Sequence, residues 1–539
     1  MSGAASTAAG SAVRRRPPPL LVAAAGAATA VVLLPLVYLA VRAGTGGLEA
    51  WTDVLGRART LELVGQTVLL VVLVTAGAVA IGVPLAWLVV RSDLPGRRVW
   101  GVAAALPLVV PSYVAALVLL AAFGPRGLLQ EALEPLGVER VPELYGLPGA
   151  VLALVLATYP YVYLLTAAAL RDLDPGLEDA ARGLGRSRAA VFRRVTLPLL
   201  RPSIGAGALL VALYTLSDFG AVSLMQYDSL TRAVFLQYRS LFDRTPAAVL
   251  ALVLVLLTAV VLVLELRTRG RGALHRSSPG AARAPAPVPL GRWRWPALGL
   301  CGGAVGFGLV VPLVVLGYWL ERAVSLGGPL AFGWEPAARS VLVSLGAAGL
   351  AVAAAVPVAV LAVRYASGWT RGLERLSYAG NALPGIVIAL SLVFFAANYA
   401  SPLYQTLGLL LVAYVIRFFA QGVAGAHSAV LRVDPHLEDA ARGLGRRPLR
   451  VFTSVTAPLA APGLLAGAAL VFLSTMKELP ATLLLRPIGF ETLATEVWTA
   501  TTVGAYSRAA LPALLLVALS APFVYVLSVR RSVEVDPPG

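Results

Sequence analysis

The side chains that could perform chemistry in this chain are few and scattered. Its 539 residues include one cysteine, Cys301, which lies in an apolar run. A single thiol forms neither an internal disulfide nor a thiolate metal site. The three histidines, too few and too scattered for a metal cluster, are His275, His427 and His436. We find no paired carboxylates and no nucleophile beside a base, so we predict no catalytic residue and no metal site, and we consider a membrane-embedded enzyme remote.

ATP hydrolysis within this polypeptide is excluded by its lysine content. A phosphate-binding loop has the form G-x-x-x-x-G-K-[ST] and needs a lysine beside the phosphates. The only lysine is Lys477, in the sequence TMKELP. We therefore predict no cofactor in this chain.

The strongest signal is a ten-residue sequence, LEDAARGLGR, that occurs twice. It occupies residues 177–186 and 437–446, an offset of 437 − 177 = 260 residues. The match continues without a gap at this offset, pairing Pro198 with Pro458 and Pro202 with Pro462. The chain is therefore a fusion of two related halves.

Each copy predicts a compact helix–turn–helix. Asp174 and Pro175 favour a helix start, because Asp caps free amides and Pro fits the first turn. Gly183 and Gly185 favour its end, because glycine accepts the left-handed conformation. We expect a second short helix that stops at Pro198.

The first helix of each copy is amphipathic. Four residues at i, i+3, i+4 and i+7 form one apolar stripe, which we expect to lie on the inner membrane surface: Leu177, Ala180, Ala181 and Leu184. We expect the opposite, charged edge to remain free for a partner: Glu178, Asp179 and Arg182, with Glu438, Asp439 and Arg442 in the second copy. An amphipathic helix resting on lipid is the simpler alternative, but it does not explain near-identity between halves whose membrane spans have diverged.

The composition indicates that these loops are carried by a membrane protein. The chain is 58% hydrophobic and 13% charged, with a mean hydropathy of +0.81, whereas a soluble domain carries roughly 25% charged residues. The net charge of +17 comes from arginines in short loops between apolar runs, which is typical of cytoplasmic loops. We therefore predict a lipid bilayer as the surroundings and no nucleic acid as a partner.

Twelve apolar runs are long enough to cross a bilayer as helices. They predict an all-α polytopic fold of about twelve transmembrane helices in two parallel six-helix repeats. We interpret the first run as a transmembrane helix and not as a cleaved signal. The predicted spans are 20–41, 63–90, 99–123, 148–170, 203–225, 246–266, 296–319, 339–363, 376–397, 404–425, 462–486 and 508–529.

The placement of the arginines predicts the orientation: both termini and both copies of the repeated loop face the cytoplasm. The expected divisions are a cytoplasmic tail at 1–19, a first half at 20–266 with its loop at 174–202, and a flexible cytoplasmic linker at 267–295. They continue with a second half at 296–529 with its loop at 434–462, and a cytoplasmic tail at 530–539.

Three of the charged residues that fall inside predicted spans are candidates for a transport role. Asp218 would lie ~23 Å into its helix at about 1.5 Å per residue, and at the 260-residue offset it aligns with Glu478, which follows Lys477. Buried charges usually face a bundle interior or water. One hypothesis is that Asp218, Lys477 and Glu478 line a translocation path, with Lys477 paired to Asp218. The other, equally weighted, is a structural ion pair between the halves or snorkelling to the interface.

The repeated loop resembles the hallmark of the membrane subunits of ATP-binding-cassette importers, E-A-A-x-x-x-G followed by I-x-L-P. The chain departs from it by Asp for Glu, Val for Ile and, in the second copy, Ala for Leu. The matching residues of the first copy are Asp179, Ala180, Ala181, Gly185, Val195, Leu197 and Pro198. Those of the second copy are Asp439, Ala440, Ala441, Gly445, Val455, Ala457 and Pro458.

The resemblance implies partners and a location. In that family such loops couple the permease to a separate ATPase that carries ATP and Mg. Two loops imply two ATPase copies per chain, and the coupling residues also include Glu178 and Glu438. The resemblance further implies an extracytoplasmic solute-binding protein and a bacterial plasma membrane.

The fused arrangement and the stretches around Asp218 and Lys477 resemble iron(III)-type permeases, with thiamine or another small polar solute as the alternative cargo. A major-facilitator secondary transporter, also six plus six, is the alternative of another class. Its loop signature is partly matched by residues 93–98, Asp-Leu-Pro-Gly-Arg-Arg, without an echo in the second half.

Overall fold

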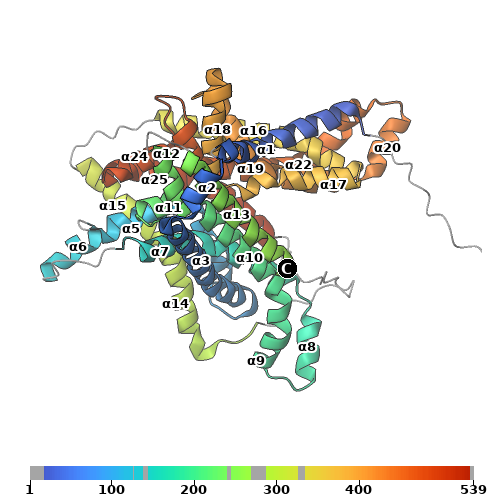
Figure 1. Cartoon of the computed structure of the whole chain (residues 1–539). Helices are drawn as coiled ribbons and strands as arrows, with labels where there is room; N and C mark the ends of the chain where they lie inside the picture. The colour runs from blue at the N-terminus through green and yellow to red at the C-terminus, as the bar shows by residue number, and fades with distance from the viewer. Residues whose placement is uncertain are drawn as a thin grey trace, which may run out of the picture. The chain divides into compact units, whose positions relative to one another are not determined.

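The computed structural model describes residues 17–45, 47–124, 127–136, 144–239, 245–268, 287–325 and 334–533. Nearly all of these residues are helical (Figure 1), and the one β-bridge among them joins Ser92 and Val288. Eleven helices in this part of the chain are long and apolar enough to cross a membrane, and α18 is a shorter apolar helix. The predicted fold class, an all-α polytopic membrane protein, is confirmed.

The described helices fall into two halves along the chain. The first half contains α1 (Pro19–Thr45), α2 (Gly47–Leu55), α3 (Ala58–Arg91), α4 (Arg97–Ala103), α5 (Ser112–Phe123), α6 (Leu128–Leu133), α7 (Leu147–Asp172), α8 (Pro175–Gly183), α9 (Arg188–Val191), α10 (Leu197–Ser217), α11 (Gly220–Leu224), α12 (Leu230–Arg239) and α13 (Thr245–Thr268). The second half contains α14 (Arg294–Val305), α15 (Val311–Ser325), α16 (Trp334–Arg364), α17 (Gly368–Ser377), α18 (Gly385–Tyr399), α19 (Leu407–Leu431), α20 (Pro435–Gly443), α21 (Pro448–Val451), α22 (Ala457–Met476), α23 (Pro480–Leu485), α24 (Leu493–Thr502) and α25 (Tyr506–Val533).

The third span of each half is shorter than predicted. The continuous helices expected at 99–123 and 376–397 are wrong, because α5 begins only after Pro111 and α18 only after Pro384. A residue that precedes proline is driven out of the helical conformation, and Val110 is indeed extended, with φ −81° and ψ 115°. The polar segments before these breaks form the separate short helices α4 and α17.

The fifth span of each half is also broken. The predicted continuous spans 203–225 and 462–486 are wrong, because α10 ends at Ser217 and α22 at Met476. Each break is followed by a very short helix, α11 or α23, and then by the polar helix α12 or α24.

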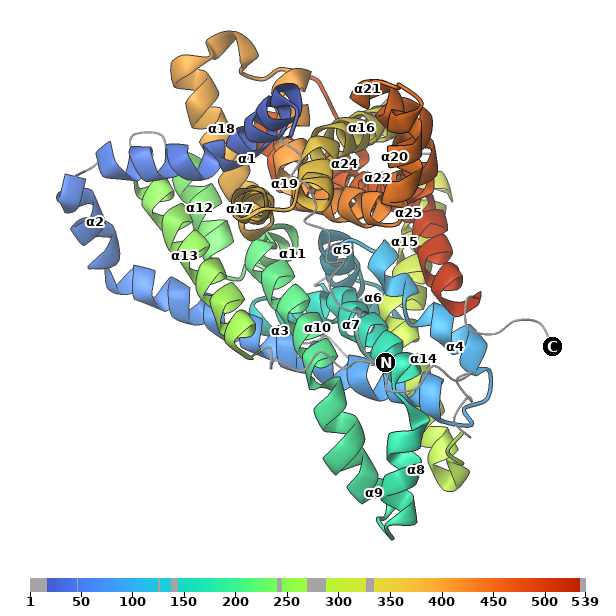
Figure 2. The ribbon, with the colours of Figure 1, turned by 90° about the vertical axis from the view of Figure 1, so that its right-hand side faces the viewer.

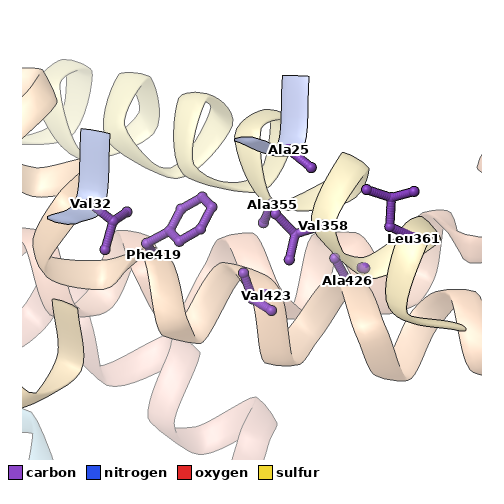
Figure 3. Close-up of a cluster of buried hydrophobic side chains, with 9 residues drawn as sticks. Ala25, Val32, Ala355, Val358, Leu361, Phe419, Val423 and Ala426 are labelled. Carbon is purple, nitrogen blue, oxygen red and sulfur yellow. The ribbon is translucent and has the colours of Figure 1, made fainter. Parts of the chain in front are cut away.

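The chain divides into two compact units. One comprises Met1–Pro35, Ser344–Asn381 and Tyr414–Thr475, and the other comprises Leu36–Val343, Ala382–Ala413 and Met476–Gly539. In the first unit, buried side chains of α1, α16 and α19 form one cluster, in which Val32, Phe419 and Val358 are less than 2% exposed (Figure 3).

Small residues allow these helices to pack closely, as is common in membranes. A methyl group added at Gly82 of α3 would lie 2.9 Å from the Cβ of Val162 in α7. In the other half, Gly422 of α19 faces Ala355 of α16, whose Cβ would lie 3.4 Å from such a methyl group. The same helix crossing therefore occurs in both halves. The glycine lies on the second span, α3, in the first half and on the fourth span, α19, in the second half.

Candidate functional site

The first helix of each copy of the repeated loop begins and ends as predicted. The side chain of Asp174 accepts a hydrogen bond from the Gly176 amide at 2.9 Å, and that of Asp434 accepts one from His436 at 2.9 Å. Gly185 and Gly445 each have φ +79°, a left-handed conformation that favours glycine. The following arginine amides donate back into the helix, Arg186 to Ala181 and Arg446 to Ala441, which is the Schellman pattern.

The predicted charged edge of the first helix is only partly at the surface, because its glutamate is turned inward. Glu178 and Glu438, expected on a free charged edge, are only 9% and 3% exposed. Their side chains point toward the second helix of the loop, where Thr196 donates to Glu178 at 2.8 Å and Thr456 donates to Glu438 at 2.9 Å. The expectation of a free carboxylate at these two positions is therefore wrong.

A buried arginine from the second span contacts each of these glutamates. Arg364, the last residue of α16, holds Glu438 with Nε at 3.2 and 3.1 Å from its two carboxylate oxygens and Nη2 at 3.1 Å from Oε1. Its Nη2 also donates to the carbonyls of Val430 and Val433 at 3.1 and 2.7 Å. The guanidinium thus joins the end of α16, the end of α19 and the second copy of the repeated loop. We call Arg364, Glu438 and Thr456 the second brace.

The corresponding first brace, Arg91, Glu178 and Thr196, is looser. Nη2 of Arg91 lies 3.6 Å from Glu178 Oε1, and none of the buried guanidinium nitrogens has a hydrogen-bond partner. One turn earlier in α3, the ring of Trp87 packs edge-on against Phe192, with centroids 6.4 Å apart. In the first half, aromatic packing therefore takes the place of some of the hydrogen bonds that hold the loop in the second half.

The outward face of each loop is apolar at its tip. Leu184 and Leu444 are each 83% exposed, and Leu177 and Leu437 are about half exposed. Asp179 and Asp439 are the acidic residues that remain at the surface, each paired with the arginine three residues on, Arg182 or Arg442. Figure 2 shows α8 and α9 extending beyond the end of α10.

The second helix of the loop does not stop at the predicted residue. In both copies, a π-helical turn, at Phe192–Thr196 and Phe452–Thr456, leads directly into the next membrane helix. Pro198 and Pro458 lie in the first turn of that helix, where a proline is tolerated. The loop is therefore continuous with α10 and α22, and the expected end at Pro198 is wrong.

Arg91 and Arg364 are the functional residues that the sequence analysis missed. The sequence does carry a signal for them, the spacing P-x-A-x-L-x-V-R, which occupies 84–91 and 357–364. Its offset is 364 − 91 = 273 residues, whereas the loops repeat at 260. An ungapped comparison at 260 cannot align them.

Asp218 lies at the break between α10 and α11 and not within a continuous helix. Its Oδ1 accepts from the amides of Ala221 and Val222 at 2.9 and 3.4 Å, and its Oδ2 accepts from the hydroxyl of Ser112, the first residue of α5. The carboxylate therefore caps α11 and ties it to the third span.

Glu478 repeats this arrangement in the second half. Its Oε1 accepts from the Ala481 amide at 3.3 Å, and a methyl group added at Gly385 would lie 2.5 Å from the same oxygen. Gly385 begins α18 as Ser112 begins α5, at the 273-residue offset. The two breaks approach each other, since a methyl group added at Gly220 would lie 3.3 Å from Leu479 Cδ2.

Lys477 does not make the predicted ion pair. Its Nζ donates to the carbonyl of Leu108, in the turn that precedes α5. No ion pair joins Lys477 to Asp218, both of which the structure describes and both of which have other partners. The hypothesis of a Lys477–Asp218 pair is therefore wrong: Lys477 bonds to Leu108, and Asp218 bonds to Ser112.

The model of the family described as "Binding-protein-dependent transport system inner membrane component" matches twice, at residues 78–266 and 348–532. The chain therefore belongs to this family, and its two matches confirm the predicted duplication. It is the permease of an ATP-binding-cassette importer, a transport protein and not an enzyme, and such permeases work with an ATPase and a binding protein.

Individual relatives differ in how much of the chain they match. The Fe(3+)-transport system permease protein FbpB 2 of Haemophilus influenzae is 34% identical over 497 residues, 92% of this chain and 95% of its own length. The Molybdenum transport system permease protein ModB of Escherichia coli is 36% identical over 29% of this chain and 69% of its own length. The Sulfate transport system permease protein CysW of Escherichia coli is 31% identical over 36% of this chain and 66% of its own length.

Proposed function

We propose that this permease imports ferric iron across a bacterial plasma membrane. An extracytoplasmic binding protein delivers the iron, and two copies of a separate ATPase subunit, which carries ATP and Mg, act on the two repeated loops. In this proposal the loops and both termini face the cytoplasm, in keeping with the arginines that cluster there.

The observation that supports iron is the extent of the similarity. The iron(III) permease of Haemophilus influenzae matches 92% of the chain and so includes both halves, whereas the molybdenum and sulfate permeases match about a third of it. A fused pair of halves is therefore a property that this chain shares with a relative named for Fe(3+). Oxyanions and thiamine are the competing substrates.

The duplicated loop supports the docking of two ATPases. The acidic residue that the importer motif places outward, Asp179 or Asp439, is exposed beside an arginine. It lies on the same helix as an exposed leucine tip, Leu184 or Leu444. An apolar patch with a charged rim is the usual composition of a protein interface.

The substrate is best tested through the binding protein. We expect the purified cognate binding protein to be stabilised by ferric ion in a thermal-shift assay and to contain iron by metal analysis. We further expect vesicles that contain this permease, its ATPase and the binding protein to accumulate iron only with hydrolysable ATP. Stabilisation by molybdate, sulfate or thiamine and not by iron would contradict the iron assignment. Uptake that persists with a catalytically dead ATPase and follows a proton gradient would contradict the importer.

We also propose that the two breaks flank the translocation path. The support is that each half places a buried carboxylate, Asp218 or Glu478, where a membrane helix is interrupted, and that the two interruptions approach each other. Irregular backbone at membrane depth is tolerated where protein or a water-filled path surrounds it. A pair of carboxylates at such a place favours a cation.

Two substitutions at Asp218 separate its charge from its capping role. Asp218→Asn keeps the Oδ1 acceptor for the Ala221 amide, so we expect normal assembly. The loss of the charge is expected to raise the barrier for a cation by on the order of 2 kcal/mol, which slows iron uptake roughly 30-fold. Asp218→Ala removes the cap as well and is expected to lower stability by a further ~1–3 kcal/mol. The measurements are uptake into vesicles and the midpoint of thermal unfolding.

The matched control is Asp228→Asn, which removes a carboxylate that pairs with Arg232 at a more exposed position. Normal iron uptake by Asp218→Asn would leave Asp218 with the capping role alone.

A further inference from the structure

The segment that joins the two halves is attached to the first half where it enters the second. The sequence predicts a flexible linker at 267–295, and residues 269–286 of it lie outside the described part. The described end, residues 287–294, makes specific contacts with the turn that follows α3. We call these eight residues the latch.

The sequence of the latch accounts for its geometry. It begins Pro287-Val288-Pro289-Leu290, in which proline nitrogens carry no hydrogen, so that only Val288 and Leu290 have amide donors. Pro289 also restricts Val288 to an extended conformation. The segment is thus a preformed short strand with two donors.

Both donors are used on the turn after α3. Val288 N–H donates to the carbonyl of Arg91 at 2.8 Å, and the Asp93 amide donates back to the Val288 carbonyl at 3.1 Å, which forms the β-bridge. The Leu290 amide donates to Asp93 Oδ1 at 2.8 Å. Arg294 Nη2 lies 3.5 Å from Asp93 Oδ2.

The latch therefore contacts the backbone of Arg91, and the side chain of Arg91 contacts the first coupling loop. The side chain of Arg91 lies beside Glu178, and its backbone carbonyl accepts the hydrogen bond from the Val288 amide. The guanidinium of Arg91 has no hydrogen-bond partner of its own. Its position depends on the packing around it and on the backbone that the latch holds.

The second half positions its arginine, Arg364, without a latch. Arg364 is fixed directly by two carbonyls and by Glu438. The turn that follows it is closed by its own residues, since Ser367 and Thr370 form a capping box at the start of α17.

We propose that the latch is a positioning element for the first coupling loop: through Arg91 and Glu178 it sets the loop against its ATPase. This inference rests on the proposed function. It assigns a role in energy coupling to a segment that would otherwise only connect two domains.

Paired substitutions test the latch. Val288→Pro removes the amide that bonds Arg91, and Val288→Ala retains it. Asp93→Ala removes the acceptor for the Leu290 amide, and Asp93→Asn retains it. We expect Val288→Pro and Asp93→Ala each to lower the iron imported per ATP hydrolysed by about fivefold, the weight of one or two hydrogen bonds. We expect each conservative variant to match the unaltered chain.

A second measurement isolates the first loop. In a chain that carries Leu444→Asp, a change meant to release the ATPase from the second loop, the remaining ATPase is held by the first loop alone. We expect the latch variants to weaken its binding in this background and to leave it unchanged in the reciprocal Leu184→Asp background. Twelve Gly/Ser residues inserted between Gly280 and Ala281 lengthen the tether and are expected to have no effect.

Full coupling in both Val288→Pro and Asp93→Ala would overturn the latch. The latch would also be overturned if its variants weakened ATPase binding equally at both loops, or if lengthening the tether lowered the iron imported per ATP hydrolysed. If Val288→Pro fails to assemble, the Asp93 pair decides between these outcomes. ATP-dependent uptake by the unaltered chain tests the proposed function separately, so that a failure of the latch is distinguishable from a failure of the importer.

Discussion

Replacing Arg364 by methionine is expected to abolish import while the protein remains in the membrane. The change removes the cation that faces Glu438, whose side chain is 4% exposed, and it also releases the carbonyls of Val430 and Val433. Removing one partner of a buried ion pair typically costs about 3–5 kcal/mol, because a charge is left without compensation. Thr456 and Arg442 still contact Glu438, so we expect the lower end of this range. We expect at least a hundredfold loss of ATP-coupled uptake in vesicles.

The double variant Arg364→Met with Glu438→Gln makes this prediction specific. It removes both charges, and a neutral pair costs less to bury than one uncompensated charge. We expect it to bind the ATPase and to transport better than Arg364→Met alone. Arg375→Met, which removes an exposed arginine from α17, is the matched control and is expected to behave normally. If the double variant is no better than the single one, the pair does not act as a unit.

The first half should respond less to the same change. Arg91 lies 3.6 Å from Glu178 and makes no hydrogen bond to it, and Trp87 already packs against the loop. Arg91→Met is therefore expected to impair coupling less than Arg364→Met. The two braces occupy equivalent positions in the halves, but only Arg364 makes hydrogen bonds to its glutamate and to backbone carbonyls.

The sequence predicts local features of the coupling loops accurately. The Asp174 cap and the left-handed Gly185 depend on residues within one helical turn of each other, so that their chemistry alone decides the geometry. The duplication strengthens this prediction, because Asp434 and Gly445 repeat the same solution.

The orientation of the loop could not be predicted in the same way. An amphipathic pattern states that one face is buried without stating which, and the usual assumption places carboxylates outside. Glu178 faces inward, where it accepts a hydrogen bond from Thr196 and lies 3.6 Å from Arg91, which is 178 − 91 = 87 residues away. That contact depends on the packing of α8 and α9 at the end of α3, which no local pattern encodes.

The broken membrane helices were missed for a different reason. Hydropathy averages over about twenty residues and does not distinguish one long helix from two short ones. The signals for the breaks were Pro111 and Pro384 in the third spans, and the charges of Asp218 and Glu478 in the fifth. Proline inside a membrane helix is often tolerated, so these signals acquire meaning only once Ser112 is seen to donate a hydrogen bond to Asp218.

Placing an aspartate at the exposed tip of each coupling loop is expected to remove the ATPases one at a time. Leu184 and Leu444 are each 83% exposed, so Leu184→Asp and Leu444→Asp should change folding stability by less than about 0.5 kcal/mol. At an interface, each change forfeits roughly 1.5–3 kcal/mol of leucine burial and buries a charge without a partner. We expect two ATPase copies on the unaltered chain, one on either single variant and none on the double variant, counted by native mass spectrometry of the solubilised complex.

The decisive comparison is with a leucine that is equally exposed elsewhere. Leu48, in α2, is 84% exposed and lies in the predicted loop between the first two spans, so Leu48→Asp is expected to retain both ATPases. The double variant Leu184→Asp with Leu444→Asp should keep its thermal unfolding midpoint, because the permease is intact. Its ATP-dependent uptake should disappear, because both ATPases are lost. If the leucine tips rest on lipid instead, both ATPases will stay bound in the double variant, and the outward face of the loop is then not the docking surface.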